Sequence, residues 1–267
     1  MQLSTGEVLL LAVVQGITEF LPISSSGHLV IFAAALSPNG TTKGLNVADV
    51  NIVLHAGTLL SILVYYWRRI WRLLREDHRS IGVLIVATLP AVVVGLPIKI
   101  LGEAVLENTL LAGAMLVATG AILLWAARLP VGQQPYAALP YGQALLIGLA
   151  QAVAILPGVS RSGATISTGI AVGMTRNEAA SFSFLMAVPA IAGAALLEII
   201  EMTTHHSPSA TPRSTLALGA AVSFAVGLGA LAWLVRWLER GRLQYFAYWC
   251  IPVGLLVIGW QLSVRSG

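Results

Sequence analysis

Six long apolar runs constrain the fold of this 267-residue chain more than any other feature. A helix needs about 20 mostly apolar residues to cross the hydrocarbon core of a bilayer. Six runs meet this length, at 49–67, 81–101, 105–127, 178–204, 214–238 and 243–263. The composition agrees, because only 10% of the residues are charged, against about a quarter in soluble domains. The sequence therefore predicts an all-α integral membrane protein with six transmembrane helices, in which residues 1–267 form a single domain.

Two further apolar segments, residues 5–36 and 141–175, are interrupted near their centres. The first break contains "FLPISSSGHL" at 20–29, and the second contains "ILPGVSRSGAT" at 155–165. Apolar stretches of about 10 to 14 residues are more typical of re-entrant pieces than of spanning helices. Each interrupted segment therefore predicts two short helices that meet inside the membrane as a re-entrant hairpin.

Two arginine clusters support this arrangement. The stretch "WRRIWRLLREDHR" at 67–79 holds five arginines, and "VRWLERGR" at 235–242 holds three. Loops rich in arginine favour the cytoplasmic side, and both clusters lie there when the six runs cross the membrane and the hairpins do not. Both termini then face outward. Because the net charge of +4 comes mainly from arginines at helix ends, without a basic face that carries aromatic residues, nucleic acid is not an expected partner.

The two interrupted segments also resemble each other. Both "QGITEFLPISSSGH" and "QAVAILPGVSRSGAT" contain a Gln, a Leu-Pro pair and a Ser-x-Ser-Gly sequence. On the arrangement above they enter the membrane from opposite sides, which makes them an inverted-topology repeat. Broken helices in such repeats usually meet near the midplane and form a binding site there. The sequence therefore predicts one site to which both breaks contribute.

The residues at the two breaks suit an anion. A helix that begins at Ser24 or Ser25, or near Ser160, leaves backbone N–H groups unpaired and directs a partial positive charge into the membrane. Arg161 adds a full charge in a planar fork that fits phosphate or carboxylate. An arginine at this depth implies a negative partner. The alternative is purely structural. In that interpretation the serines only cap helices, Arg161 pairs permanently with Glu19, and His28 is an interior histidine whose hydrogen bonds are satisfied.

The spacing of the polar residues indicates catalysis. Gln15 and Glu19 share one face of the first short helix, and Ser25 and His28 share one face of the second. A hydroxyl beside an imidazole that a carboxylate orients is the general arrangement of an activated nucleophile. We expect four catalytic residues, Glu19, Ser25, His28 and Arg161. We expect the substrate phosphate to be held by Ser24, Ser26, Ser160, Arg161, Ser162 and Thr165. Two ionisable residues near span ends, His55 and Glu178, are further candidates for the lining of the cavity.

These motifs resemble the two signatures of the undecaprenyl pyrophosphate phosphatase family, bacterial enzymes associated with bacitracin resistance. The first signature is Glu or Gln, three residues, Glu, and then a serine pair and a histidine. The second is Pro-Gly-x-Ser-Arg-Ser-x-x-Thr, and both occur here in order. The resemblance implies six spanning helices with two re-entrant hairpins. It also implies removal of the terminal phosphate of undecaprenyl pyrophosphate, which recycles the lipid carrier for cell-wall synthesis.

The resemblance further implies a site that opens to the periplasmic face of the bacterial cytoplasmic membrane, and a divalent cation, Mg²⁺ or Ca²⁺. Glu19 and Gln15 match the acidic pair of the family, and His28 matches its essential histidine. Gln15 departs from the glutamate that many members carry, and it offers a carbonyl oxygen without charge. We therefore expect weak metal binding by Glu19 and Gln15, with substrate oxygens as the remaining ligands. A homodimer also stays open.

Several alternatives remain at this point. The nucleophile is Ser25 with His28 as its base, or His28 itself, or water. A polyprenyl-phosphate flippase or anion-coupled transporter is an alternative function, because inverted repeats with broken helices are common in transporters. The phosphatidic-acid-phosphatase superfamily is rejected, because it needs a histidine six residues after its arginine and this chain has Ser167 there.

Overall fold

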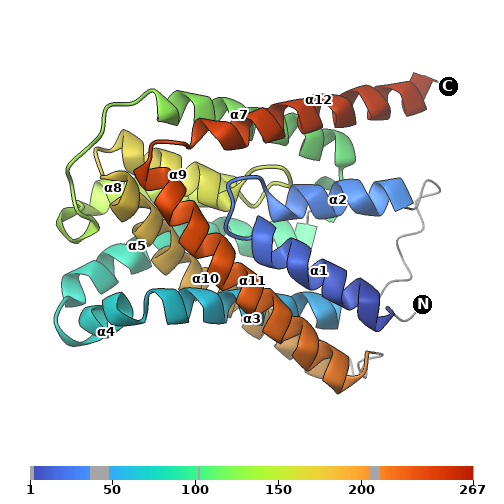
Figure 1. The fold of residues 1–267 in the computed structure, drawn as a ribbon, viewed down its shortest axis with the longest axis horizontal. Coiled ribbons are helices and arrows are strands. Elements are labelled where there is room, and N and C mark those ends of the chain that lie inside the picture. Colours follow the sequence, from blue (N-terminus) through green and yellow to red (C-terminus); the bar gives the residue numbers. More distant parts are fainter. Residues whose placement is uncertain (1–2, 37–47, 102, 205–210, 267) are drawn as a thin grey trace.

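The structure is a computed structural model that describes residues 3–36, 48–101, 103–204 and 211–266. These residues form a bundle of α-helices (Figure 1) and contain no β-strand, only an isolated bridge between Gln134 and Met174. The prediction of an all-α protein is confirmed over this part of the chain. The helices are α1 (Thr5–Thr18), α2 (Ser25–Leu36), α3 (Ala48–Tyr65), α4 (Trp67–Arg75), α5 (His78–Leu101), α6 (Glu103–Leu106), α7 (Thr109–Ala127), the 3₁₀ turn η1 (Tyr136–Ala138), α8 (Tyr141–Val153), α9 (Arg161–Ala171), α10 (Arg176–Thr204), α11 (Arg213–Glu239) and α12 (Gln244–Ser266).

The lengths of the helices support a multi-pass membrane protein. Within the described residues, α5, α7, α10, α11 and α12 are each long and apolar enough to cross a bilayer. A sixth span requires α3 and α4 together, and these two helices meet at a bend of 72°. Because of this bend, most of the arginine cluster at 67–79 lies in a separate helix, α4. The predicted outer segments 37–48 and 205–213 lie mostly outside the described residues.

One predicted span is present but begins later than the apolar run that predicted it. The run 105–127 was expected to be a single span, but α7 begins only at Thr109. The side chain of Asn108 accepts a hydrogen bond from the Leu111 N–H at 3.0 Å and caps the helix there. The preceding residues belong to the short helix α6.

Each interrupted segment forms two short helices, as predicted. α1 and α2 come from the first segment, and α8 and α9 come from the second. With 14 residues, α1 is about 21 Å long and cannot cross a hydrocarbon core of about 30 Å. In Figure 1, the chain turns back after α1 and continues as α2, which contacts it. The two segments also dock in a similar way, because the first short helix of each packs against one long helix. α1 packs against α11, and α8 packs against α5.

Close packing holds the first break inside the bundle and also brings α3 against α11. Phe20 lies in this break, is fully buried, and contacts Phe184 of α10 with ring centroids 5.7 Å apart. α3 approaches α11 so closely that a Cβ on Gly57 would lie 2.5 Å from the backbone oxygen of Ala220. Small residues at such contacts are usual in membranes, where van der Waals packing replaces the hydrophobic effect between helices.

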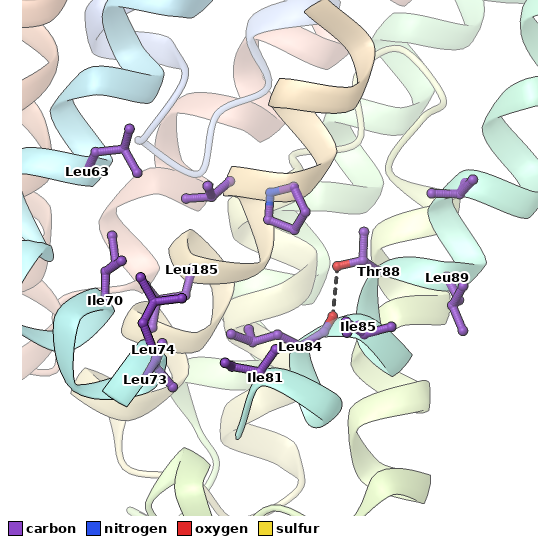
Figure 2. A pocket seen from close by; sticks show the side chains of 13 residues that line it. Leu63, Ile70, Leu73, Leu74, Ile81, Leu84, Ile85, Thr88, Leu89 and Leu185 are labelled. Atoms are coloured by element: carbon purple, nitrogen blue, oxygen red, sulfur yellow. Dashed lines mark hydrogen bonds between the residues drawn. The ribbon is translucent and has the colours of Figure 1, made fainter. Parts of the chain in front are cut away.

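An apolar groove of about 400 Å³ lies among α3, α4, α5 and α10 (Figure 2). Of the thirteen residues that line it, only Thr88 has a polar side chain, and its hydroxyl donates to the Leu84 backbone oxygen at 2.8 Å. This groove can contact hydrocarbon, but its lining offers no group for binding or transferring phosphate.

Candidate active site

The two breaks meet at one small pocket of about 150 Å³. Each break supplies half of the lining, and five of the lining residues are serines. The full lining is Thr18, Glu19, Ser24, Ser25, Ser26, Ala154, Val159, Ser160, Arg161 and Ser162. The structure therefore brings together most of the residues that the sequence selected, while their chemical roles stay predictions.

Two glycines let the breaks touch. A Cβ on Gly27 of α2 would lie 2.7 Å from the Cα of Gly158 in the second break. Gly158 itself has a φ of +92°, which residues with a Cβ rarely adopt. Thr119 of α7 holds this turn, since its hydroxyl donates to the Gly158 backbone oxygen at 2.9 Å and accepts from the Ser160 N–H at 3.1 Å. The start of α9 is therefore fixed at the pocket.

At the start of each short helix that follows a break, a serine side chain accepts a backbone hydrogen bond beside the pocket. The Ser160 side chain accepts a hydrogen bond from the Gly163 N–H at 3.1 Å and caps α9. At the start of α2, the Ser24 side chain accepts from the Gly27 N–H at 3.2 Å. Ser24 has a φ of +66°, a left-handed conformation that is costly for a residue with a side chain. The two helix starts place partial positive charge at the pocket.

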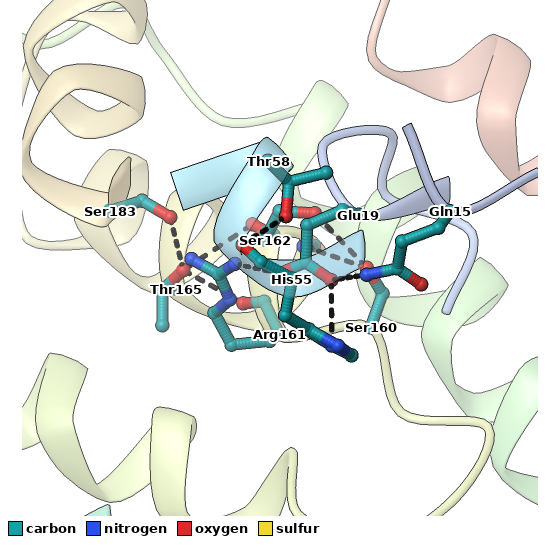
Figure 3. A network of polar contacts seen from close by, with 10 residues as sticks. Gln15, Glu19, His55, Thr58, Ser160, Arg161, Ser162, Thr165 and Ser183 are labelled. Carbon is teal, nitrogen blue, oxygen red and sulfur yellow. Dashed lines mark hydrogen bonds and ion pairs between the residues drawn. The ribbon is translucent and has the colours of Figure 1, made fainter. Parts of the chain in front are cut away.

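Arg161 and Glu19 join the two breaks through an ion pair (Figure 3). The guanidinium Nη2 donates to the Glu19 Oε1 at 2.6 Å, and the side chains are only 18% and 9% exposed. The other terminal nitrogen of Arg161, Nη1, is buried and has no hydrogen-bond partner among the described residues. An unpaired buried donor is costly. The structural alternative accounts for the ion pair but leaves this second donor unexplained, whereas an anionic ligand would satisfy it.

Glu19 has two further neighbours (Figure 3). The Gln15 Nε2 donates to the Glu19 Oε2 at 3.0 Å, and the His55 Nε2 lies 3.8 Å from the same oxygen. His55 reaches the site from α3, and its Nδ1–H donates to the Asn51 backbone oxygen at 2.9 Å. The sequence singled out His55 only by its place near a span end, because no local motif links it to Glu19.

Glu178, the other candidate of that kind, does not line the pocket. Its carboxylate instead binds Arg69 of α4 at 2.9 Å and accepts from the Tyr136 N–H at 3.1 Å. Burial is the main cause that raises the pKa of Tyr136 above its usual value. This group of residues stabilises the contact between α4, η1 and α10.

The residues around Glu19 do not fit a divalent cation held by the protein alone. One Glu19 oxygen binds the Arg161 guanidinium, and the other accepts from Gln15. Within the described residues, no group of three or more His, Cys, Asp or Glu side chains could hold a metal. Mg²⁺ and Ca²⁺ need about six or more oxygen ligands, so the predicted pair of Gln15 and Glu19 is far from a complete site.

His28 does not line the pocket, and its ring nitrogens bond to groups other than the predicted partner, Ser25. Its Nδ1–H donates to the Ser24 backbone oxygen at 2.8 Å. Its Nε2 accepts from the indole N–H of Trp249 at 3.0 Å, and the two rings stack at an interplanar angle of 12°. The predicted Ser25–His28 contact is wrong for this structure, because both ring nitrogens are engaged elsewhere. Trp249 lies on α12, and its position in the sequence gave no indication of this contact.

Thr165 also lies behind the pocket. Its hydroxyl donates to the Arg161 backbone oxygen at 2.8 Å, one turn earlier in α9, and lies 2.6 Å from the Ser183 hydroxyl of α10. Thr165 is buried and does not line the pocket. In this structure Thr165 supports the helix that carries Arg161, and its contact with phosphate stays a prediction.

Comparison with known proteins gives consistent matches over almost the whole chain. The family model described as "Bacitracin resistance protein BacA" matches residues 8–256. A protein of Rhodopirellula baltica named Undecaprenyl-diphosphatase is 53% identical over 251 residues, which cover 94% of this chain and 96% of the relative.

Two more distant relatives carry the same name. The protein of Desulforudis audaxviator is 39% identical over 94% of this chain and 96% of its own length. That of Corynebacterium efficiens is 37% identical over 96% of this chain and 90% of its own length. Because the family model and full-length relatives agree, this chain belongs to the bacitracin resistance protein BacA family.

Proposed function

We propose that this protein hydrolyses undecaprenyl pyrophosphate to undecaprenyl phosphate and inorganic phosphate. The names of its full-length relatives support this activity. The observation in the structure that carries the proposal is the free Nη1 of Arg161, buried at a pocket lined by five serines. A buried guanidinium donor together with two helix starts suits a phosphate group. None of the relatives described above carries a transporter name, so the transporter alternative has no support.

The pocket would hold the terminal phosphate of the substrate. The Arg161 Nη1 would donate to one phosphate oxygen, while Nη2 keeps its bond to Glu19. The starts of α2 and α9 would add partial positive charge where negative charge accumulates during phosphoryl transfer. The polyprenyl tail would lie among the apolar side chains that face lipid.

Ser25 is the proposed nucleophile. Its hydroxyl oxygen would form a bond to the terminal phosphorus while the phosphoanhydride bond breaks and undecaprenyl phosphate leaves. Since His28 is engaged with Ser24 and Trp249, we assign the hydroxyl proton to Glu19, the acidic residue among the described residues that line the pocket. Water would then cleave the phosphoserine and release inorganic phosphate. Direct attack by water remains the competing mechanism.

The test of the function is phosphate release from undecaprenyl pyrophosphate by the purified protein in detergent. We expect release by the wild type and its loss in Glu19→Ala and Arg161→Ala. Tight binding of the substrate without release would contradict the proposed function. Substrate labelled in its terminal phosphate and quenched with acid should leave label on Ser25, and an unlabelled protein during turnover would favour direct attack by water.

The remaining features of this proposal concern the membrane, the cation and assembly. The arginine clusters at 67–79 and 235–242 support an orientation in which both clusters face the cytoplasm. A pocket that opens to the periplasmic face of the cytoplasmic membrane is what the family resemblance implies. The corresponding docking of α1 on α11 and of α8 on α5 supports six spans with two re-entrant hairpins in an inverted repeat. A Mg²⁺ or Ca²⁺ ion would need substrate oxygens for most of its ligands. A homodimer remains a prediction.

A further inference from the structure

His28 has a hydrogen-bonding pattern that fixes which of its ring nitrogens carries the proton. The indole N–H of Trp249 can only donate, so the His28 Nε2 that faces it at 3.0 Å must accept through its lone pair. The backbone oxygen of Ser24 can only accept, so the His28 Nδ1, 2.8 Å away, must carry the proton. Both contacts together require a neutral imidazole with the proton on Nδ1.

Such an imidazole is poorly placed to act as a base or a nucleophile. The Nε2 lone pair, the basic site of this tautomer, is occupied by the Trp249 donor. The ring is buried, with 8% of the residue exposed, and His28 does not line the pocket. The second histidine near the site differs in this respect, because the His55 Nε2 faces the Glu19 carboxylate. Both histidines donate a hydrogen bond through Nδ1, but their Nε2 atoms face different partners.

The contact that His28 makes through Nδ1 acts on the most strained residue of the pocket. Ser24 is the non-glycine residue with positive φ, at +66°, among the described residues. In this conformation its backbone oxygen accepts from His28 and its side chain accepts from the Gly27 N–H at 3.2 Å. A strained conformation persists only when surrounding contacts hold it. His28 therefore stabilises the turn that places Ser24 and its neighbour Ser25 at the pocket.

We propose that His28 and Trp249 are positioning residues: Trp249 holds His28 as the neutral Nδ1–H tautomer, and this tautomer holds the Ser24 turn at the pocket. Trp249 is half exposed on the surface of α12, so it reaches His28 from the outer side of the bundle. The effect of this arrangement on turnover rests on the proposed phosphatase function. The tautomer and the turn do not.

Two substitutions of His28 separate positioning from proton transfer. Asparagine places an amide N–H near the position of Nδ1, and this group can donate to the Ser24 oxygen but cannot act as a base. We expect His28→Asn to retain kcat within about tenfold of the wild type, the range of one net hydrogen bond, and His28→Ala to lose far more. Loss of a general base typically lowers the rate by about 10²–10⁴-fold. If His28→Asn falls by this larger factor while its thermal unfolding is unchanged, the proposal is overturned.

Nitrogen NMR of ¹⁵N-histidine-labelled protein tests the tautomer without any assay of activity. We expect the His28 signal, assigned by its loss in His28→Asn, to show a protonated Nδ1 and an unprotonated Nε2. In Trp249→Phe, which keeps the stacked ring but removes the donor, we expect mixed tautomers and a kcat lowered by about two- to tenfold at unchanged KM. Trp260→Phe, the same change elsewhere on α12, should alter neither.

The outcomes of these measurements are distinguishable. A wild-type His28 with its proton on Nε2, or a Trp249→Phe variant with an unchanged tautomer, would overturn the positioning role. A wild type that shows the expected tautomer but releases no phosphate would instead refute the proposed function, and the inference about Trp249 and His28 would stand.

Discussion

Replacing Arg161 with lysine tests whether the free arm of the guanidinium binds the transferred phosphate. In the structure, Nη2 is bonded to the Glu19 Oε1 at 2.6 Å, and Nη1 is buried without a partner among the described residues. Lysine keeps the positive charge but has a single ammonium, so it can pair with Glu19 or with phosphate without the geometry of the planar fork. The variant therefore loses one of the two donor arms.

The magnitude follows from what one such donor contributes. A donor directed at charge that develops in the transition state typically contributes about 10²–10³-fold in kcat, or about 2.7–4 kcal/mol. We expect Arg161→Lys to lower kcat by this factor and to change KM less, because the charge that attracts the substrate is retained. The assay is the dependence of phosphate release on the concentration of undecaprenyl pyrophosphate.

Arg69→Lys is the matched control. Arg69 also pairs with a glutamate, since its Nη1 lies 2.9 Å from the Glu178 Oε1, but it does not line the pocket. This control should keep the kcat of the wild type, and both variants should unfold at similar temperatures. A wild-type kcat in Arg161→Lys would refute the reasoning that the second arm of the fork holds phosphate. An equal loss of kcat in Arg69→Lys would show that the effect is structural.

Three further predictions concern the same pocket. Glu19→Gln should destabilise the fold by up to about 3–5 kcal/mol, because it leaves the Arg161 guanidinium without its counter-charge. Denaturant unfolding measures this change, and an unchanged free energy of unfolding would contradict the prediction. Gly27→Ala should cost about 1–3 kcal/mol, since its Cβ would lie 2.7 Å from Gly158, whereas Gly142→Ala meets no atom within 4 Å and should be neutral or stabilising. Calorimetric titration of the substrate-free protein with Mg²⁺ or Ca²⁺ should show no saturable site, and tight binding abolished by Glu19→Gln would show that the protein alone holds a cation.

The sequence predicts the breaks because their signals are local, and it predicts the shared pocket because the two interrupted segments resemble each other. A Leu-Pro pair followed by serines stops one helix and caps the next within a few residues, and this chemistry needs no tertiary context. Run lengths similarly indicate most of the spans. Where the helices differ from the predicted spans, the causes are local features that a hydropathy pattern does not resolve. Examples are the Asn108 cap, which makes α7 begin later, and the 72° bend between α3 and α4.

The sequence does not predict which polar groups pair across the bundle. Ser25 and His28 share a helix face by spacing, yet the partner of the His28 ring is Trp249, 221 residues away. Thr165 shares a face with Arg161, but its hydroxyl bonds within its own helix and to Ser183. Spacing shows which side chains can meet along one helix, whereas the choice between such contacts depends on the neighbouring helices. These are α12 for His28 and α10 for Thr165.

The ion pair between Glu19 and Arg161 explains how the chain carries a guanidinium at a depth where an unpaired charge would be costly. Glu19 comes from the first break and Arg161 from the second, so each charge is compensated only when the two breaks are in contact. The close approach of Gly27 to Gly158 and the contacts of Thr119 with the second break create that contact. Packing of the two breaks therefore determines both the stability of the buried charges and the presence at the pocket of the Arg161 Nη1, which is unpaired among the described residues and which we propose donates to phosphate. A variant that separates the breaks should lose both properties together, even if every polar side chain of the pocket is retained.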